Sequence, residues 1–173
     1  PLGGVPVRWL RYSACARFFK AAMTLITSSD NARFRELVGL AGSARDRRQS
    51  GLTLIDGLHL IDTYRQRIGE PQQLVVGDSG RHRPDVAALL TACPSVPCLE
   101  LSDALFRRLS PVQTPTGILA IIPIPERQPL PGKPEACVLL EDVQDTGNLG
   151  SILRSTAAAG IRQVYLSAQC ADL

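Results

Sequence analysis

The stretch EDVQDTGNLGSILRS, residues 141–155, contains the residue types best suited to chemistry in this sequence of 173 residues. It follows a buried-type apolar run, turns at two glycines and an asparagine, and continues as a helix that bears Arg154. A strand, a glycine-rich turn and a helix often hold a nucleotide, because the first amide groups of the helix point at the ligand. However, Gly147, Asn148 and Gly150 match neither a Walker phosphate loop nor the G-x-G-x-x-G pattern. Spacing leaves two interpretations open: a functional loop that uses Asn148 and Arg154, or an N-capped helix with a solvent-facing arginine.

A second candidate is the basic segment SARDRRQSG, residues 43–51, which we expect to form a loop. Arg45, Arg47 and Arg48 could contact RNA phosphates there, since a guanidinium group binds phosphate through charge and paired hydrogen bonds. A solvated surface loop is the alternative, because an aspartate within the segment offsets part of the charge. The whole chain carries a net charge of +3, and residues 1–22 hold four basic residues and no acid. The overall charge therefore does not indicate nucleic-acid binding.

Neither metal nor disulfide chemistry is indicated by the cysteines and histidines. The five cysteines are scattered, and only Cys93 and Cys98 lie close together, at a spacing typical of neither a zinc site nor a redox pair. With only two histidines, far apart in the sequence, we expect no metal site. Scattered cysteines in odd number are typical of reduced thiols, so we expect a cytoplasmic protein. No apolar run approaches the roughly 20 residues that span a bilayer, so we expect no membrane partner.

The remaining sequence must supply the elements that position these residues, and it alternates between helix and strand patterns. This alternation predicts an α/β fold with a mostly parallel sheet. The two glycines of the 141–155 stretch permit a positive φ or a close backbone approach in the turn. Expected helices are one capped by Ser29 or Asp30, then 57–66, 84–92, 103–109 and 149–159; expected strands are 52–55, 73–77, 97–101, 117–122, 136–140 and 163–167. The last helix should bury Leu149, Ile152, Leu153, Thr156 and Ala157.

The chain is expected to divide at a proline-rich linker. Residues 123–135, PIPERQPLPGKPE, hold five of the 13 prolines, and proline fixes φ and cannot donate to a sheet. Residues 23–122 would form one domain, and residues 136–173 would form a β-α-β unit that is small for a domain. Residues 1–22 precede the only methionine, Met23, and are expected to be a disordered extension. We therefore expect the chain to stop within its second domain.

Residues 138–160, VLLEDVQDTGNLGSILRSTAAAG, closely resemble the first motif of the SpoU/TrmH family. These are RNA ribose 2′-O-methyltransferases of the SPOUT superfamily. Upstream, LIDGLHL at residues 54–60 and LSPVQTPTGILA at residues 109–120 resemble the family's N-terminal substrate-binding domain. That domain is an α/β/α module similar to RNA-binding ribosomal proteins. Asp56 stands where a glutamate is more usual, and the resemblance extends from about Met23 to the end of the chain.

The resemblance implies an activity, a cofactor and catalytic residues. Family members methylate RNA with S-adenosylmethionine, and ribosomal RNA, 23S rRNA included, is expected as the substrate ahead of transfer RNA. Asn148 and Arg154 match motif positions implicated in catalysis. Arginine rarely acts as a base because its pKa exceeds about 12, so Arg154 would stabilise the developing alkoxide and grip an adjacent phosphate. Asn148 would orient Arg154 or the ribose.

The resemblance also predicts what this chain does not contain. In the family the S-adenosylmethionine pocket comes from two later motifs threaded as a trefoil knot. We therefore expect no cofactor-binding residue here, a missing knot, and no activity of the chain alone. The complete protein is expected to be a homodimer. A stand-alone RNA-binding module without catalysis is the alternative, and an ordinary doubly wound nucleotide-binding enzyme is disfavoured because the loop lacks the required glycine spacing.

Overall fold

The computed structural model describes residues 25–110, 115–125 and 136–171. They separate into two compact units, Pro1–Ile124 and Pro125–Leu173, so the division falls within the proline-rich segment 123–135. The predicted extension at residues 1–22 and most of the predicted linker lie outside the described residues.

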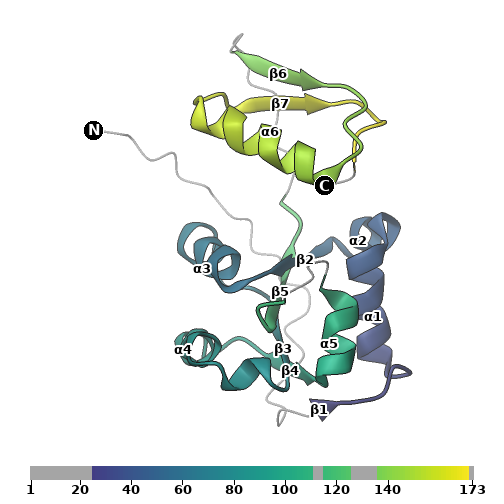
Figure 1. Cartoon of the computed structure of the whole chain (residues 1–173), viewed down its shortest axis with the longest axis vertical. Coiled ribbons are helices and arrows are strands. Elements are labelled where there is room, and N and C mark those ends of the chain that lie inside the picture. Colours follow the sequence, from purple (N-terminus) through teal and green to yellow (C-terminus); the bar gives the residue numbers. More distant parts are fainter. Residues whose placement is uncertain (1–24, 111–114, 126–135, 172–173) are drawn as a thin grey trace. The chain divides into compact units, whose positions relative to one another are not determined.

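The first unit is a five-stranded sheet with helices on both faces, which confirms the predicted α/β class. Helices α3 and α4 cover one face, and α1 and α5 cover the other (Figure 1). In chain order its elements are β1 (Leu25–Ile26), α1 (Ala32–Gly42), α2 (Ala44–Ser50), β2 (Leu52–Asp56), α3 (Leu58–Arg67), β3 (Gln73–Gly77), the 3₁₀ turn η1 (Gly80–His82), α4 (Pro84–Ala92), β4 (Cys98–Leu101), α5 (Asp103–Leu109) and β5 (Ile118–Pro123).

The sheet is mixed, and the prediction of a mostly parallel sheet fails only at β5, because β1, β2, β3 and β4 run in one direction and β5 runs against them. Its strand order is β1-β4-β3-β5-β2. Strand β4 is parallel to both β1 and β3, whereas β5 is antiparallel to both β3 and β2. The reversed direction of β5 was not predicted, for a physical reason. Strand β5 is buried on both faces, and a continuous apolar run is typical of a parallel strand but also occurs in a central antiparallel one.

Two hydrophobic clusters fill the two sides of this sheet. Because successive side chains of a strand point to opposite faces, Val75 joins the cluster under α1 and α5, and its neighbours Leu74 and Val76 join the cluster under α3 and α4. Phe34 and Phe106 anchor the first cluster, and both are almost completely buried. The three consecutive core residues of β3 therefore hold both helical layers to one sheet.

Helices α1 and α2 differ from the sequence prediction at their ends. Asn31, not Ser29 or Asp30, caps α1, because its side chain accepts a hydrogen bond from the Arg33 amide at 2.9 Å. The segment predicted as a basic loop is helix α2. Ser43 caps it by accepting from the Asp46 amide at 3.2 Å, and Gly51 ends it in the left-handed conformation with φ of 68°.

A close backbone contact joins η1 to the start of β5. A Cβ atom placed on Gly80 would lie 2.5 Å from the carbonyl oxygen of Gly117, which real Cβ atoms do not tolerate. Gly117 itself has φ of 90°, and its carbonyl accepts from the Gly77 amide at 3.1 Å. Glycine at both positions therefore allows the loop after β3 to lie directly on β5.

The second unit consists of strand β6 (Cys137–Leu140), helix α6 (Thr146–Ala158) and strand β7 (Gln163–Leu166). The two strands are parallel and place Val138 opposite Val164 and Leu140 opposite Leu166. Helix α6 packs on one face of this pair through buried Leu149 and Thr156 (Figure 1). Ala157, which was predicted to face inward, is exposed.

Helix α6 begins three residues earlier than the sequence predicts. Asp145 is its N-cap, so Gly147, Asn148 and Gly150 lie inside the first turns of the helix and not in a turn before it. None of the three has a positive φ, which corrects the expected role of the two glycines. The asparagine was expected to cap the helix or meet a ligand, and the capping role belongs to the aspartate three residues before it.

Candidate functional site

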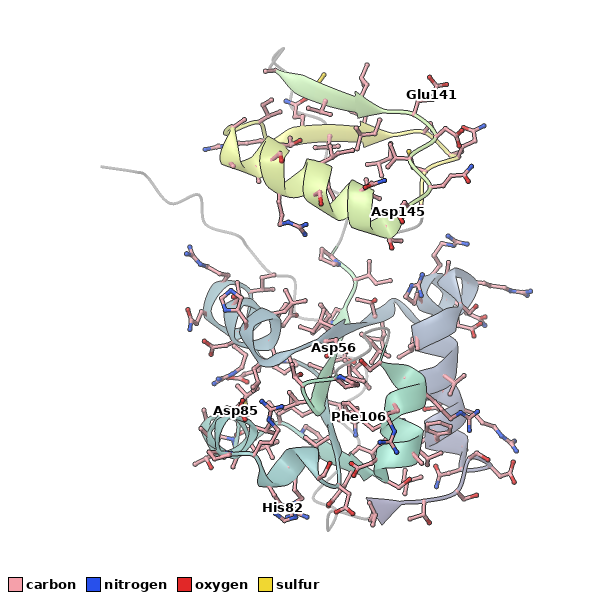
Figure 2. The ribbon with its side chains drawn as sticks, viewed as in Figure 1. Asp56, His82, Asp85, Phe106, Glu141 and Asp145 are labelled. Atoms are coloured by element: carbon pink, nitrogen blue, oxygen red, sulfur yellow. The ribbon has the colours of Figure 1, made fainter. Side chains whose placement is uncertain are left out.

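The candidate site is the beginning of α6, where the N-cap organises the backbone. Asp145 lies where the helix begins (Figure 2). Its Oδ1 accepts from the Asn148 amide at 2.6 Å. A Cβ on Gly147 would lie 3.1 Å from the same carboxylate oxygen, so glycine leaves room for the cap. A carboxylate at this end also complements the positive pole of the helix. These contacts hold Asn148 at the exposed start of the helix.

Arg154 lies on the exposed surface of α6 and is held by the helix itself. Its Nη2 donates to Ser151 Oγ at 3.0 Å, and that hydroxyl donates to the carbonyl oxygen of Gly147 at 2.9 Å. Gly147, Ser151 and Arg154 lie along one side of the helix, since positions three and four apart are neighbours on a helix surface. A Cβ on Gly150 would come within 3.4 Å of Arg154 Nη1, so the glycine leaves space beside the guanidinium group.

Asn148 and Arg154 lie on the same helix but do not contact each other. The two residues are six positions apart, so they are offset by about 9 Å along the helix axis and by about 120° around it. Within the part of the chain that the structure describes, the Asn148 side chain makes no hydrogen bond, and Arg154 bonds to Ser151. Ser151 is therefore a site residue that spacing did not reveal. The signal was present, because Ser151 stands midway between Gly147 and Arg154 at helical intervals.

The loop from β6 to α6 is tied to the end of β7. The Asp142 amide donates to Ser167 Oγ at 3.2 Å, and the Ala171 amide donates to the Val143 carbonyl at 2.8 Å. Asp142 has φ of 54°, the only positive value among the non-glycine residues that are described. Aspartate tolerates this left-handed conformation better than most residues. Glu141 follows β6 directly and is exposed (Figure 2).

The three arginines of α2 have different environments. Arg45 and Arg48 are exposed and stand one helical step apart. Arg47 is half-buried, and its Nη1 donates to the Leu40 carbonyl at 3.1 Å, which satisfies a backbone group near the end of α1. The structure therefore gives Arg47 a role in joining two helices, and Arg45 and Arg48 are the exposed arginines of this segment.

Asp56, the residue that differs from the glutamate more usual in the SpoU/TrmH family, joins the two upstream segments of the resemblance. Its Oδ2 accepts a hydrogen bond from Ser110 Oγ. The next residue, Gly57, donates its amide to the Ile118 carbonyl at 3.3 Å. The shorter acid therefore still reaches across from β2 to the segment that follows α5.

The two described thiols of the first unit, Cys93 and Cys98, are not activated nucleophiles. Burial raises the pKa of Cys98 to about 11, and the charge of Glu100 on the same strand adds to the shift. Burial also raises the pKa of Cys93. Both groups are therefore protonated near neutral pH. Among the described residues, no group of three or more His, Cys, Asp and Glu side chains could hold a metal ion, and no helix is long and apolar enough to cross a membrane.

Comparison with known proteins identifies the family. The MRM3-like substrate binding domain matches residues 31–120, just over half of the chain. The 23S rRNA (guanosine(2553)-2′-O)-methyltransferase RlmP of Bacillus subtilis (strain 168) is 28% identical over 150 residues, which cover 87% of this chain and 57% of that protein. The chain belongs to the SpoU/TrmH family. A solved RNA 2′-O ribose methyltransferase is 30% identical, with a TM-score of 0.69 over 83% of this SpoU/TrmH chain and 55% of its own.

The fold of this SpoU/TrmH chain also matches a neighbour with a bound cofactor. The SpoU methyltransferase AviRb from Streptomyces viridochromogenes, solved in complex with AdoMet, has a TM-score of 0.68 at 23% identity. The match covers 82% of this chain and 55% of AviRb. The chain thus spans little more than half the length of RlmP and of these two solved proteins.

One groove of the second unit lacks the carboxylates that would suit S-adenosylmethionine. A groove of about 600 Å³ runs beside α6 and β7, lined by apolar side chains such as Leu153 and Ile161 and by one charged side chain, Arg162. The cofactor carries a sulfonium, an ammonium group and a ribose diol, which call for acceptor groups such as carboxylates. No carboxylate is among the lining residues of this groove.

Proposed function

We propose that this protein acts in the 2′-O-methylation of ribose in RNA, with ribosomal RNA, 23S rRNA included, as the substrate. The match of residues 31–120 to a substrate-binding domain of rRNA methyltransferases carries the proposal. In this proposal the first unit binds RNA, and the second unit contributes the RNA-facing side of the active site. S-adenosylmethionine supplies an electrophilic methyl group in the complete enzyme, as it is the cofactor of AviRb.

The exposed start of α6 supports the catalytic part of the proposal. A ribose 2′-hydroxyl is a weak nucleophile and loses its proton as it attacks a methyl group. The guanidinium group of Arg154 would stabilise the developing alkoxide or hold a neighbouring phosphate. Ser151 holds only one of its terminal nitrogens, so the other donors of the guanidinium group can reach a ligand. Asn148, with a side-chain amide that has no described partner, would orient the ribose.

Two further expectations belong to the proposal. The complete protein would be a homodimer in which Arg154 acts across the interface, and it would work in the cytoplasm. Light scattering of the complete protein tests the first expectation, and a monomer at catalytic concentrations would contradict it. On the RNA side, Arg45 and Arg48 on the exposed face of α2 would contact phosphates, whereas Arg47 is engaged by the end of α1.

The experiment is methyl transfer from tritiated S-adenosylmethionine to unmodified 23S rRNA by the full-length protein. Alkaline hydrolysis leaves 2′-O-methylated positions as resistant dinucleotides, so labelled dinucleotides identify the modification. Removing one donor that stabilises a developing oxyanion costs about 10²–10³ in rate, and we expect a loss of this size for Arg154→Ala. The matched control is Arg162→Ala, an exposed arginine of the same unit.

The outcomes separate the two functions suggested by the sequence. Wild-type turnover by Arg154→Ala, with folding checked by circular dichroism, would remove Arg154 from the catalytic machinery. Tight RNA binding by the full-length protein without any labelled dinucleotide would favour the RNA-binding module over the enzyme. The absence of both activities would overturn the proposed function.

A further inference from the structure

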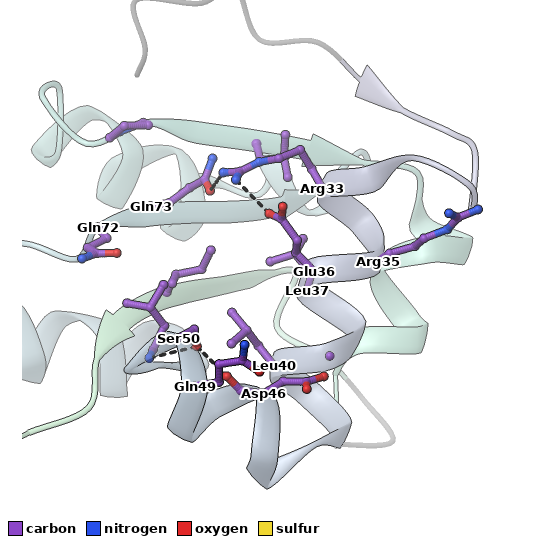
Figure 3. Close-up of a pocket in the computed structure, with 15 residues that line it drawn as sticks. Arg33, Arg35, Glu36, Leu37, Leu40, Asp46, Gln49, Ser50, Gln72 and Gln73 are labelled. Carbon is purple, nitrogen blue, oxygen red and sulfur yellow. Dashed lines mark hydrogen bonds and ion pairs between the residues drawn. The ribbon is translucent and has the colours of Figure 1, made fainter. Parts of the chain in front are cut away.

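A groove of about 770 Å³ lies on the first unit, between α1, α2 and the sheet (Figure 3). Its apolar floor comes from three different strands, through Leu52 of β2, Leu99 of β4 and Ile121 of β5. Helices α1 and α2 form one wall at helical spacing. The wall residues are Arg33, Glu36, Leu37, Leu40, Asp46, Gln49 and Ser50.

Planar polar groups surround this floor, and part of their bonding capacity is unused. Arg33 Nη2 donates to Gln73 Oε1 at 3.0 Å, and Arg33 Nη1 donates to Glu36 Oε2 at 2.9 Å (Figure 3). These bonds leave the amide NH₂ of Gln73 and the second oxygen of Glu36 available. The side chains of Gln49 and Gln72, which also line the groove, make no hydrogen bond to any described residue.

This combination of groups is complementary to a nucleobase. Amide, carboxylate and guanidinium groups are the side chains that form paired hydrogen bonds with base edges. An apolar floor can take the flat face of the ring, and unpaired bases are commonly recognised by stacking together with hydrogen bonds to their edges. Pockets for small molecules usually enclose about 70–90% of the ligand surface, whereas most of the polar lining here is exposed. An open groove suits a base that remains attached to a strand.

The charges beside the groove are complementary to the phosphates of such a strand. Arg45 and Arg48 each precede a wall residue of α2, Asp46 and Gln49, and both arginines are exposed. Adjacent helical residues point about 100° apart, so the two cations stand at the rim while their neighbours face the groove. A base in the groove would therefore bring its flanking phosphates toward this rim.

We propose that the groove binds one unpaired base of an RNA strand, with the adjacent phosphates at Arg45 and Arg48. This inference rests on the proposed function to the extent that RNA is the substrate. It adds a location and a mode of recognition, because it requires single-stranded RNA and assigns base contact to Gln49 and Gln73.

The test is fluorescence anisotropy of the 173-residue chain with a short labelled single-stranded RNA and with the same sequence as a duplex. Each of Gln49→Ala and Gln73→Ala should weaken single-strand binding roughly three- to tenfold and leave duplex binding unchanged. Arg45→Ala should weaken binding to both forms and lower the salt slope of single-strand binding by about 0.7. The matched control is Gln66→Ala on α3, an exposed glutamine outside the groove.

The results distinguish the groove from the proposed function. If the wild-type chain binds single-stranded RNA and the two groove variants bind it as tightly as Gln66→Ala, the groove proposal is wrong and RNA binding stands. If the wild-type chain binds neither RNA, the RNA-binding part of the proposed function fails, and the groove proposal fails with it.

A second measurement identifies the occupant directly. In ¹⁵N NMR spectra the side-chain amide signals of Gln49, Gln72 and Gln73 should shift on addition of single-stranded RNA. If free nucleoside monophosphates bind with the same affinity as single-stranded RNA, the groove is a site for free nucleotides. Shifts with a mixture of short peptides but not with RNA would indicate a peptide site. Either of these results would overturn the proposal.

Discussion

Replacing Arg81 with methionine should destabilise the first unit strongly, because Arg81 neutralises a buried carboxylate. Glu100 on β4 is 5% exposed, and its Oε2 accepts from Arg81 Nη1 at 2.7 Å. Removing one partner of a fully buried pair costs about 3–5 kcal/mol. The Arg81 side chain is 39% exposed, so solvent screens part of the interaction, and we expect a loss of about 2–3 kcal/mol.

Urea unfolding and thermal unfolding, both followed by circular dichroism, measure this loss. A loss of about 2–3 kcal/mol lowers the Tm of a unit of about 100 residues by roughly 8 °C or more. The matched control is Arg83→Met, because Arg83 pairs with Asp85 at 2.8 Å with both side chains about half exposed. Such a surface pair contributes little to stability, because solvent screens it. Equal destabilisation by the two variants would show that Glu100 does not depend on Arg81.

The Cys98 thiol provides an independent readout of the same pair. Burial is the main cause of its raised pKa of about 11, the Glu100 charge raises it further, and Arg81 lowers it. Arg81→Met should therefore raise the pKa of Cys98, and Glu100→Gln should lower it. The pH dependence of alkylation by iodoacetamide measures both shifts. A pKa that moves the same way in both variants would contradict the assignment of charges.

Three other predictions concern single positions. Asp145→Ala removes the N-cap of α6, and we expect it to lower the stability of the second unit by about 1 kcal/mol. Hydrogen exchange of the Asn148 amide should become faster, because this amide loses its hydrogen-bond acceptor. An unchanged exchange rate would show that Asp145 does not cap the helix. Gly80→Ala would place a Cβ 2.5 Å from an opposing backbone carbonyl, and we expect a urea-measured loss of more than about 2 kcal/mol. Gly42→Ala is the control and should not destabilise the unit, because a Cβ on Gly42 would meet no atom within 4 Å. Because folding raises the pKa of Cys98 from 9.0 to about 11, its contribution to stability is complete below about pH 9 and is lost as the pH rises to about 11. Cys98→Ala should abolish that part of the pH dependence of the urea midpoint.

The sequence predicted the exact bounds of some helices and strands and missed others. The difference depends on whether the residues that determine an element are local in the sequence. Helices 84–92 and 103–109 and strand 73–77 were predicted with their observed bounds. Their signals are local: Pro84 at a helix start and continuous apolar runs. Helix α2 was missed because residues 44–50 have no apolar periodicity and no buried residue. Its formation depends on the Ser43 cap, on Gly51 and on the bond from Arg47 to α1.

The candidate site shows the same limit at the level of single side chains. The motif predicted that Asn148 and Arg154 matter, but not that α6 begins at Thr146 with both residues already helical. A cap is decided by which side chain reaches the first free amide, and Asp145 reaches it before Asn148 can. The partner of Arg154, Ser151, follows from the helix start, because only a continuous helix aligns residues 147, 151 and 154.

By itself the amino-acid sequence determined the α/β class, most helix and strand positions, and the family motif at the start of α6, because each is written in residues close along the chain. Only the tertiary structure decided the direction of β5, the partner of Arg47 on α2, and the groove between α1, α2 and the sheet. The groove combines Arg33, Gln73, Leu99 and Ile121, which are far apart in the sequence. Such contacts depend on how strands pair and cross, and pairing is set by the packing of the whole sheet and not by local pattern.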